Sequence, residues 1–569
     1  MKIRFRITLL SIVLSALFLH AAGQNQYSDQ KSMLQKINAL GRDYSSLCSV
    51  KSLCRTAGNN EVMVITIGTG DKDNKPGIAV VGGTVGSHLL GRELALGFAS
   101  SLLKESSSPE IRNLLERITF YVFPDVSPDA AGQYFSDLKF ERNVNARPVD
   151  EDRDFTADED PYEDLNKDGF ITLIRVSDPS GTYLEAEEDK RIMVPADLAK
   201  GQKGAFLVYS EGIDNDKDGS FNEDGPGGVN FNRNLTFNYE EFGANAGLHP
   251  VSEPETKAVL DFLFDRFNIY AVISFGPQDN LGQPMKASER PSSAQQAAQQ
   301  QFGQMPPQGM TQGQMMGQMR MVTGERRFTS ILKSDEVINK LVSDKYHEIT
   351  GIKGAPSPRP EPGNFMEWAY FHYGRYSFST PAWWFPVERD KNADAAFLTY
   401  AADNKIENVF VPWTEIKHPD FPDKKTEVGG IIPFASINPP ADKLEDLITK
   451  NYKFILAVAD MHPELEFLDV SIENKGDNIY RMSLKVHNKG IFATCAEAGE
   501  TNTWTRLMRL SLETSGNQKF LSGQKVQRIQ RLEGGKSAEF SWLINGSGKI
   551  TITAGAVNTG IITTSAELK

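Results

Sequence analysis

The stretch that decides the fold is residues 77–94, "GIAVVGGTVGSHLLGREL". It opens with a short apolar run rich in β-branched residues, which favours a buried strand. Glycines end the run, and apolar residues then recur at four-residue spacing from Leu90 to Leu102, as on one face of a helix. The stretch therefore predicts a strand, a glycine-rich turn and a helix. His88 lies in the turn, where a metal ion could use its imidazole.

Similar units follow along the chain to about residue 430. "ITFYVFP" (118–124) and "IYAVISF" (269–275) are further β-rich runs, and amphipathic stretches lie between such runs. In "SEPETKAVLDFL", Ser252 precedes Glu255 by three residues, which predicts a capping box at a helix start. The alternation predicts an α/β layered domain over residues 24–430.

The pattern changes toward the C-terminus. Apolar residues alternate from Tyr480 to Val486, and further alternating segments follow to the end of the chain. This pattern predicts an antiparallel β-sandwich over residues 465–569, joined to the first domain by a linker helix within residues 431–464. Residues 291–319 are rich in Gln, Met, Pro and Gly, and we expect a loop without chemistry there.

The N-terminus has the composition of an export signal. Residues 1–23 combine Lys2, Arg4 and Arg6 with an apolar run and a small-residue end, which predicts a signal peptide cleaved near Gln24. We therefore expect a secreted or periplasmic protein with no transmembrane segment in the mature chain. In an oxidising compartment Cys48 and Cys54 could pair, leaving Cys495 over; the alternative is three unpaired thiols.

The net charge of −13 is concentrated in two inserts. Residues 150–168 hold ten acidic and two basic residues, and residues 211–224 hold six acidic and one basic, so the rest of the chain is neutral. This distribution argues against a nucleic-acid partner and favours local cation binding.

Within these inserts, "DLNKDG" (164–169) and "DNDKDG" (214–219) place oxygen-bearing side chains at positions one, three and five, with glycine at six. That alternation turns several oxygens toward one hard cation. Position twelve holds Arg175 or Gly225 instead of a bidentate glutamate, so we expect constitutive calcium loops; the alternative is a solvated acidic insert. The candidate ligands are Asp150, Asp152, Asp154, Asp164, Asn166, Asp168, Asp214, Asp216, Asp218 and Asp224.

Six ordered segments give the chain a resemblance to the zinc carboxypeptidase family of metallopeptidases, in a secreted bacterial branch. The resemblance implies a three-layer α/β domain with a mixed sheet, and a zinc ion that activates water for peptide cleavage. The segments that carry it are "IAVVGGTVGSHLLGREL", "FPDVSPDAAG", "GVNFNRN", "HPVSEPETKAV", "ISFGPQDNL" and "FMEWAYFHYGRYSFSTPAWWFP".

The resemblance also shows where this chain departs from the family. Val85 stands at the position of the first zinc-binding histidine, His88 at the glutamate ligand and Gly276 at the distant histidine. Pro381 stands at the glutamate that acts as general base. Three of these residues have no side-chain lone pair, so they can neither bind zinc nor accept a proton. We expect the zinc site to be degenerate, and Val85, His88 and Gly276 to meet on one pocket floor.

Part of the substrate-binding apparatus matches better. Asn232 and Arg233 match the family's pair that holds a terminal carboxylate, and a guanidinium can bind a carboxylate through two hydrogen bonds. Arg142 or Arg147 corresponds to the family's oxyanion-stabilising arginine. The leading hypothesis is a protein that binds a peptide or peptide-like C-terminus without hydrolysing it. The alternatives are an active zinc metallocarboxypeptidase with substitute ligands, and a structural scaffold.

Overall fold

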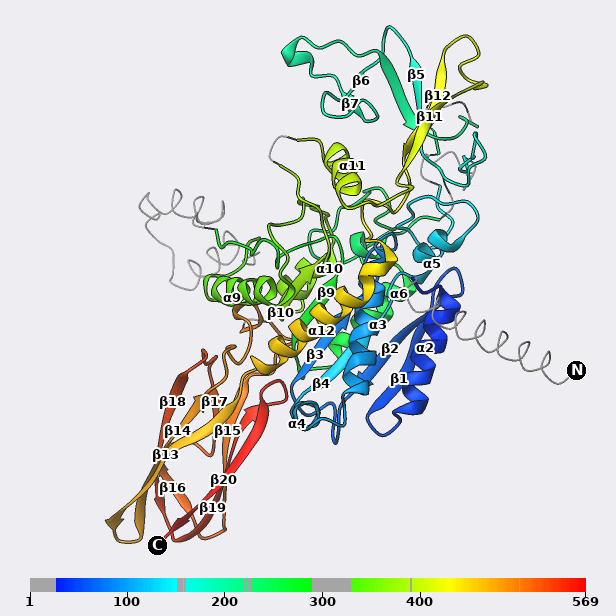
Figure 1. Ribbon diagram of the computed structural model, residues 1–569. Helices are drawn as coiled ribbons and strands as arrows, with labels where there is room; N and C mark the ends of the chain where they lie inside the picture. Colours follow the sequence, from blue (N-terminus) through cyan, green and yellow to red (C-terminus); the bar gives the residue numbers. More distant parts are fainter. Residues whose placement is uncertain are drawn as a thin grey trace, which may run out of the picture.

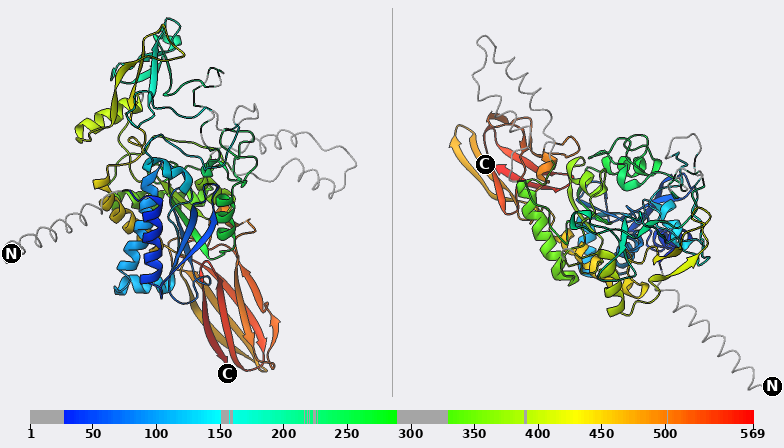
Figure 2. Two further views of the ribbon diagram at one scale, coloured as in Figure 1. Left: turned by 90° about the vertical axis from the view of Figure 1, so that its right-hand side faces the viewer. Right: turned by 90° about the horizontal axis from the view of Figure 1, so that it is seen from above.

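The computed structural model describes residues 27–288, 329–388 and 391–569, except 151–156, 158, 159, 216, 218, 220, 223, 224, 226 and 501. The predicted signal peptide and the Gln- and Met-rich loop lie outside the described residues. Figure 1 shows a central α/β domain with a small β-lobe at one end and a β-sandwich at the other, and the left-hand view of Figure 2 shows the same arrangement.

A six-stranded mixed sheet forms the centre of the molecule, with strand order β1-β2-β4-β3-β9-β10. β4, β3, β9 and β10 run parallel, while β1 pairs antiparallel with β2, and β2 with β4. The strands are β1 (Cys48–Arg55), β2 (Glu61–Ile67), β3 (Gly77–Val81), β4 (Thr119–Phe123), β9 (Ile269–Phe275) and β10 (Tyr376–Thr380). The strands predicted near residues 77, 118 and 269 are thereby confirmed.

Helices cover both faces of this sheet, because successive strand side chains point to opposite sides. In β3, Ile78 and Val80 pack into one core, and Ala79 and Val81 into the other. The first core holds α2 (Gln30–Asp43), α3 (Leu89–Lys104), α4 (Pro109–Arg117), α9 (Lys333–Thr350) and α12 (Leu444–Asp460). The second holds α6 (Pro254–Phe264) and most of α10 (Phe365–Phe371). The three-layer mixed-sheet fold is confirmed.

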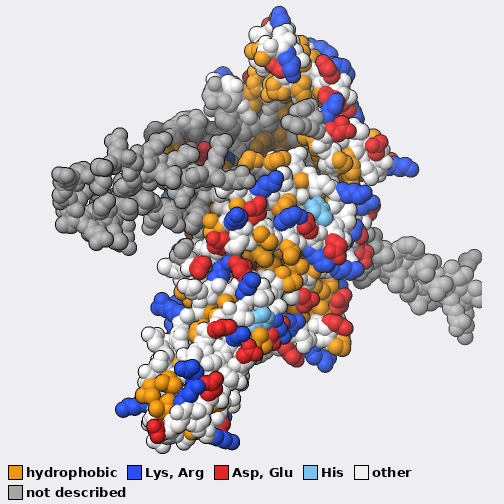
Figure 3. All heavy atoms as spheres, turned by 90° about the vertical axis from the view of Figure 1, so that its left-hand side faces the viewer, with side chains coloured by type: hydrophobic (Ala, Val, Ile, Leu, Met, Phe, Trp, Pro, Cys, Tyr) orange, Lys and Arg blue, Asp and Glu red, His pale blue; other side chains and the backbone are white. Residues whose placement is uncertain are grey.

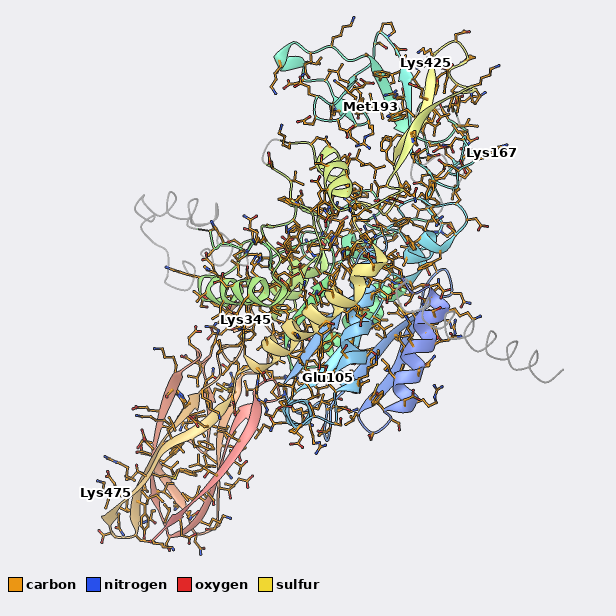
Figure 4. The ribbon with its side chains drawn as sticks, viewed as in Figure 1. Glu105, Lys167, Met193, Lys345, Lys425 and Lys475 are labelled. Carbon is orange, nitrogen blue, oxygen red and sulfur yellow. The ribbon has the colours of Figure 1, made fainter. Side chains whose placement is uncertain are left out.

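The β-lobe is a second six-stranded sheet that the sequence did not predict. Strands far apart in sequence meet there, since β12 pairs antiparallel with β5. Met193 and Lys425, labelled in Figure 4, mark its position above the central domain. In sheet order the strands are β11 (Phe410–Ile416), β12 (Thr426–Ile431), β5 (Leu173–Ser177), β8 (Phe206–Ser210), β6 (Tyr183–Glu185) and β7 (Met193–Pro195). The short helices α5 (Pro128–Ala131) and α11 (Ala393–Asp403) belong to the loops of the central domain.

The C-terminal part forms the expected antiparallel sandwich, and Lys475 in Figure 4 marks its far end. Its two four-stranded sheets enclose a separate core that includes the fully buried Trp542. The elements are β13 (Leu465–Gly476), β14 (Ile479–Asn488), α13 (Glu497–Glu500), β15 (Met508–Thr514), β16 (Lys519–Ser522), β17 (Val526–Ile529), β18 (Lys536–Asn545), β19 (Gly548–Ala556) and β20 (Gly560–Leu568).

Buried polar contacts fix this sandwich to the central domain. Asp335, in the first turn of α9, accepts hydrogen bonds from the Glu497 backbone N–H (2.8 Å) and the Tyr370 hydroxyl (2.8 Å). It also pairs with Arg531 at 3.3 Å, with both side chains buried. The helix expected as a linker is α12, and it packs on α3 and α9 as a layer of the core.

One local expectation was wrong, and the structure decides between the two alternatives left open for the cysteines. The first residue before α6 is Glu253, which makes no side-chain cap, and Ser252 donates to the Glu253 carboxylate, so there is no capping box. Cys48 and Cys54 are unpaired, as is Cys495. Cys48 and Cys54 lie at opposite ends of the extended strand β1, where six residues span about 20 Å, too far for a disulfide.

No helix among the described residues is long and apolar enough to cross a membrane. Acidic and basic side chains are interspersed over the described part of the face shown in Figure 3.

Candidate functional site

The glycine-rich turn after β3 places His88 directly before α3. Gly83 has a φ of 67°, and a Cβ there would lie 2.3 Å from Asp125, so the turn depends on glycine. The His88 ring is buried, and its Nε2 lies 3.1 Å from the carbonyl oxygen of Pro381. Since a carbonyl only accepts, Nε2 carries the proton, and Nδ1 is left without a hydrogen-bond partner in the described chain. Burial lowers the pKa of His88 to about 4, so the imidazole is neutral at pH 7.

The four positions that the resemblance singled out lie together at the carboxyl ends of neighbouring strands. Val85 and His88 line one cavity, and His88 and Pro381 line the cavity next to it. Gly276, directly after β9, donates its N–H to Thr380 at 3.2 Å. A Cβ at Gly276 would lie 2.3 Å from the Thr84 hydroxyl, so the turn before His88 fills the space of a side chain at position 276.

The side chains gathered there do not fit a zinc ion. They contribute one imidazole, and its Nε2–H is already bonded to a carbonyl, whereas a catalytic zinc needs three protein ligands. Two neighbouring carboxylates are engaged elsewhere: Glu93 accepts from the Ser28 N–H at 2.5 Å, and Asp125 pairs with Arg92 at 2.7 Å. Glu141 and Glu361 line a cavity with His88, but the three are not grouped closely enough to hold a metal ion. Throughout the described chain, no three or more His, Cys, Asp or Glu residues are grouped so that they could hold a metal ion.

Two adjoining cavities open beside His88 and share Arg359 as a wall. One, of about 230 Å³, is polar, and Glu141 and Glu361 line it. The other, of about 60 Å³, is lined by Trp383, Trp384 and Phe385. Together they form a bipartite cleft with a charged part and an aromatic part.

A proline-rich segment forms one side of both cavities. Residues 353–363 read "KGAPSPRPEPG", and proline at every second position from Pro356 stiffens an extended backbone. Arg359 and Glu361 lie two residues apart on this segment. The exposed Arg359 guanidinium makes no hydrogen bond or ion pair with any described residue.

The two carboxylates of the cleft are held without a cation. One oxygen of Glu141 accepts from the Phe434 N–H at 2.9 Å, and Glu361 accepts from the Asn232 amide at 3.1 Å. Burial in the surrounding protein raises the pKa of both carboxyl groups, and the positive charge of Arg359 partly lowers the pKa of Glu141. Glu141 is nevertheless open to solvent through the cleft.

The predicted carboxylate-binding pair, Asn232 and Arg233, is held by other side chains, and Asn232 lies behind Gln278 and Glu361 of the polar cavity wall. The Asn232 amide donates to Gln278 at 2.6 Å and to Glu361, and its oxygen accepts from the Phe365 N–H at 2.9 Å. Arg233 pairs with Glu240 at 2.8 Å. Neither residue is among those that line the two cavities.

The candidate oxyanion arginines are also engaged by the protein itself. Arg147 pairs with Glu253 at 2.7 Å, and Arg142 donates to the carbonyl oxygens of Val144 and Asn145 at 3.1 and 2.7 Å.

Three residues of the cleft were not predicted from the sequence: Arg359, Glu361 and Glu141. The alternation of proline with charged residues at 356–362 was the signal that could have found the first two.

The acidic loops share one backbone form. In 164–169, Asp164 accepts from the Gly169 N–H at 2.8 Å, and Lys167 and Gly169 have φ values of 63° and 86°. In 214–219, Asp214 accepts from the Gly219 N–H at 3.1 Å, and Lys217 and Gly219 have φ values of 71° and 96°. One oxygen of Asp214 is buried without a partner in the described chain. Lys167 in Figure 4 marks the first loop, at the edge of the molecule.

Only some of the remaining candidate calcium ligands lie among the described residues. Asp150, Asn166 and Asp168 are described, and Asn166 accepts from the Asp168 N–H at 3.0 Å. Asp152, Asp154, Asp216, Asp218 and Asp224 lie outside the described residues.

Comparison with known proteins gives two family matches. Residues 33–169 match the zinc carboxypeptidase family, and residues 464–567 match a domain of unknown function, DUF8731. Mouse carboxypeptidase M is 26% identical over 113 residues, which cover 19% of this chain and 26% of the mouse protein. The chain thus spans about a quarter of that curated relative.

Two solved structures resemble the chain at low overall similarity. Carboxypeptidase A from Helicoverpa armigera is 11% identical with a TM-score of 0.40, over 77% of this chain and 74% of that one. Bovine thrombin-activatable fibrinolysis inhibitor, in complex with tick carboxypeptidase inhibitor, is 13% identical with a TM-score of 0.36, over 76% of this chain and 99% of that one. The central domain is zinc carboxypeptidase-like, a likeness that the family match carries over residues 33–169.

Proposed function

We propose that this protein binds a peptide or peptide-like C-terminus in the cleft beside His88, and that it has lost zinc and zinc-dependent hydrolysis. The supporting observation is the chemistry of the cleft floor. Val85 and Pro381 line the cleft, and Gly276 lies against Thr84 outside that lining; none of the three offers a side-chain ligand or base, and the remaining imidazole, of His88, donates to a backbone carbonyl.

The anchor for a ligand carboxylate in this proposal is Arg359. Its guanidinium is unpaired within the described chain and lies on a stiff segment that walls the cleft, whereas Arg233 and Arg147 already hold carboxylates. A guanidinium that binds a carboxylate through two hydrogen bonds gains both energy and orientation. Arg359 therefore replaces the Asn232 and Arg233 pair as the proposed carboxylate site.

The test measures hydrolysis and binding on the same preparation. Short peptides with free carboxy termini are titrated into the protein, and release of the last residue is followed in parallel. We expect binding without release, a loss of at least about tenfold in affinity in Arg359→Ala, and no change in the control Arg42→Ala, which alters an exposed arginine on α2. Release of the last residue would instead favour an active metallocarboxypeptidase with substitute ligands. No binding of any peptide would favour a scaffold.

We also propose calcium for the acidic loops, in a structural role. The shared backbone form of 164–169 and 214–219 and the unpaired oxygen of Asp214 support it. Export likewise stays a proposal that rests on residues 1–23. N-terminal sequencing of protein recovered outside the expressing cell should begin near Gln24.

A further inference from the structure

The polar cavity has more acidic than basic side chains in its lining, and these charged side chains form no ion pair with one another. Glu141 and Glu361 line it together with a single cation, Arg359, and no ion pair joins Arg359 to either carboxylate. The two acids come from separate parts of the chain: Glu141 follows the loop after β4 and is tied to Phe434, whereas Glu361 lies on the proline-rich segment. Both acids are held by neutral donors, Glu141 by the Phe434 N–H and Glu361 by side-chain amides including that of Asn232.

A ligand can complete this arrangement by supplying both missing charges. A carboxylate on the ligand complements Arg359, and a cation complements the acids. Within the described chain, the groups that donate hydrogen bonds to these two carboxylates are neutral: the Phe434 N–H for Glu141, and side-chain amides including that of Asn232 for Glu361.

The adjoining aromatic cavity identifies the rest of the ligand. This cavity of about 60 Å³ is lined by Trp383, Trp384 and Phe385 together with Arg359, so it suits a small apolar group and is unsuited to a cationic side chain. The cation is therefore assigned to the ligand's amino terminus and not to its side chain. The polar cavity of about 230 Å³ fits a molecule of amino-acid or dipeptide size.

We propose that the cleft selects a short zwitterion, a free amino acid or dipeptide, with its carboxylate on Arg359, its ammonium between Glu141 and Glu361, and a small apolar side chain against Trp383 and Phe385. This inference rests on the proposed binding function and narrows it to ligands with a free amino group. A blocked or longer peptide presents a neutral amide at the same place and leaves the two carboxylates unpaired.

The experiment compares four probes by calorimetric titration of the full mature chain at neutral pH. Glycyl-valine carries both charges and a small apolar side chain. N-acetyl-glycyl-valine lacks the ammonium, glycyl-valine amide lacks the carboxylate, and N-acetyl-glycyl-lysine moves the cation to the side chain. We expect glycyl-valine to bind and each of the other three to bind at least about tenfold more weakly.

Substitutions of the two cavity acids then test whether these acids bind the ammonium group of the ligand. Glu141→Gln removes a carboxylate that is open to solvent and should weaken glycyl-valine about tenfold, while leaving N-acetyl-glycyl-valine unchanged. Glu361→Gln should act in the same direction, and if it disturbs the Asn232 contact and fails to fold, Glu141→Gln still decides. The control Glu348→Gln changes an exposed acid on α9, paired with Lys345, and should have no effect.

The outcomes separate the two proposals. Equal affinity for glycyl-valine and its acetylated form would overturn the zwitterion inference and leave peptide binding intact. Equal or tighter binding of N-acetyl-glycyl-lysine would overturn the assignment of the cation to the amino terminus. Failure of all four probes, while longer peptides with free carboxy termini still bind, would overturn the inference alone; failure of those longer peptides as well would overturn the proposed function and the inference with it.

Discussion

At the scale of single residues, His88 links the cleft to the pH dependence of folding. Burial holds its pKa near 4, below the ordinary value of 6.5, so the unfolded chain takes up a proton at a higher pH than the folded chain. Stability contributed by neutral His88 is complete above pH 6.5 and is lost as the pH falls toward 4. Between pH 7 and pH 5 we expect a loss of about 2 kcal/mol in the free energy of unfolding. His88→Gln keeps a donor for Pro381 and should remove this part of the slope in urea titrations; an unchanged slope would contradict the buried neutral imidazole.

Glu255 should change the pH dependence of stability in the opposite direction to His88. Its carboxyl is buried at the start of α6, and the Asn145 amide donates both to it (2.8 Å) and to Glu253 (2.7 Å). Burial is the main cause that raises the pKa of Glu255 to about 7 from 4.5, so the unfolded chain loses this proton first. Stability from this group therefore falls as the pH rises from 4.5 to 7, by about 2 kcal/mol between pH 5 and pH 7.5.

Glu255→Gln tests this prediction, because it keeps an oxygen for Asn145 and cannot ionise. The variant should be more stable than the natural protein at pH 7.5 and close to it at pH 5, measured by urea unfolding at both values. If the natural protein were the more stable one at pH 7.5, the carboxylate would be favourable where it lies, and its raised pKa would be wrong.

At the scale of elements, the two acidic loops should respond to calcium. Their carboxylates repel one another unless a cation neutralises them, so a bound ion stabilises the folded chain by mass action. We expect removal of calcium with EGTA to lower Tm by several degrees, and calcium to restore it. Asp164→Asn should weaken the response, whereas Asp442→Asn, an exposed acid beside α12, should not. If EGTA leaves Tm unchanged, the loops do not bind calcium and are solvated acidic inserts.

The sequence predicted those elements whose apolar pattern is strong. β3, α3 and β9 are buried along their whole length or over a full face, so their periodicity is visible in the chain. The β-lobe was missed because strands such as β5 and β8 are short and half-buried, and because the paired strands β5 and β12 lie about 250 residues apart. In the cleft, Val85 and His88 could be placed because the motif sits at a strand end. Arg359 could not be placed in the cleft from the sequence, because an exposed loop has no periodic pattern. The role of Arg233 could not be predicted either, because it depends on a contact with Glu240 that only the folded chain shows.

At the scale of the whole molecule, the sandwich should unfold together with the central domain. Arg531 and Asp335 join them as a buried ion pair, and removing one partner leaves a buried charge unpaired. We expect Arg531→Ala to cost about 3 kcal/mol and to divide a single calorimetric transition into two. Lys489→Ala removes an exposed pair with Glu464 within the sandwich and should change stability by less than about 1 kcal/mol. Two transitions already present in the natural protein would contradict this rigid connection.

The central proposal is that the cleft has lost the zinc ion that the zinc carboxypeptidase likeness implies. Its most direct test is a competitive zinc titration of the protein in the presence of calcium, with His88→Ala as the matched variant. The account predicts no tight zinc site and identical titrations for the two proteins. A stoichiometric zinc ion that is lost in His88→Ala, together with release of C-terminal residues from peptides, would contradict it.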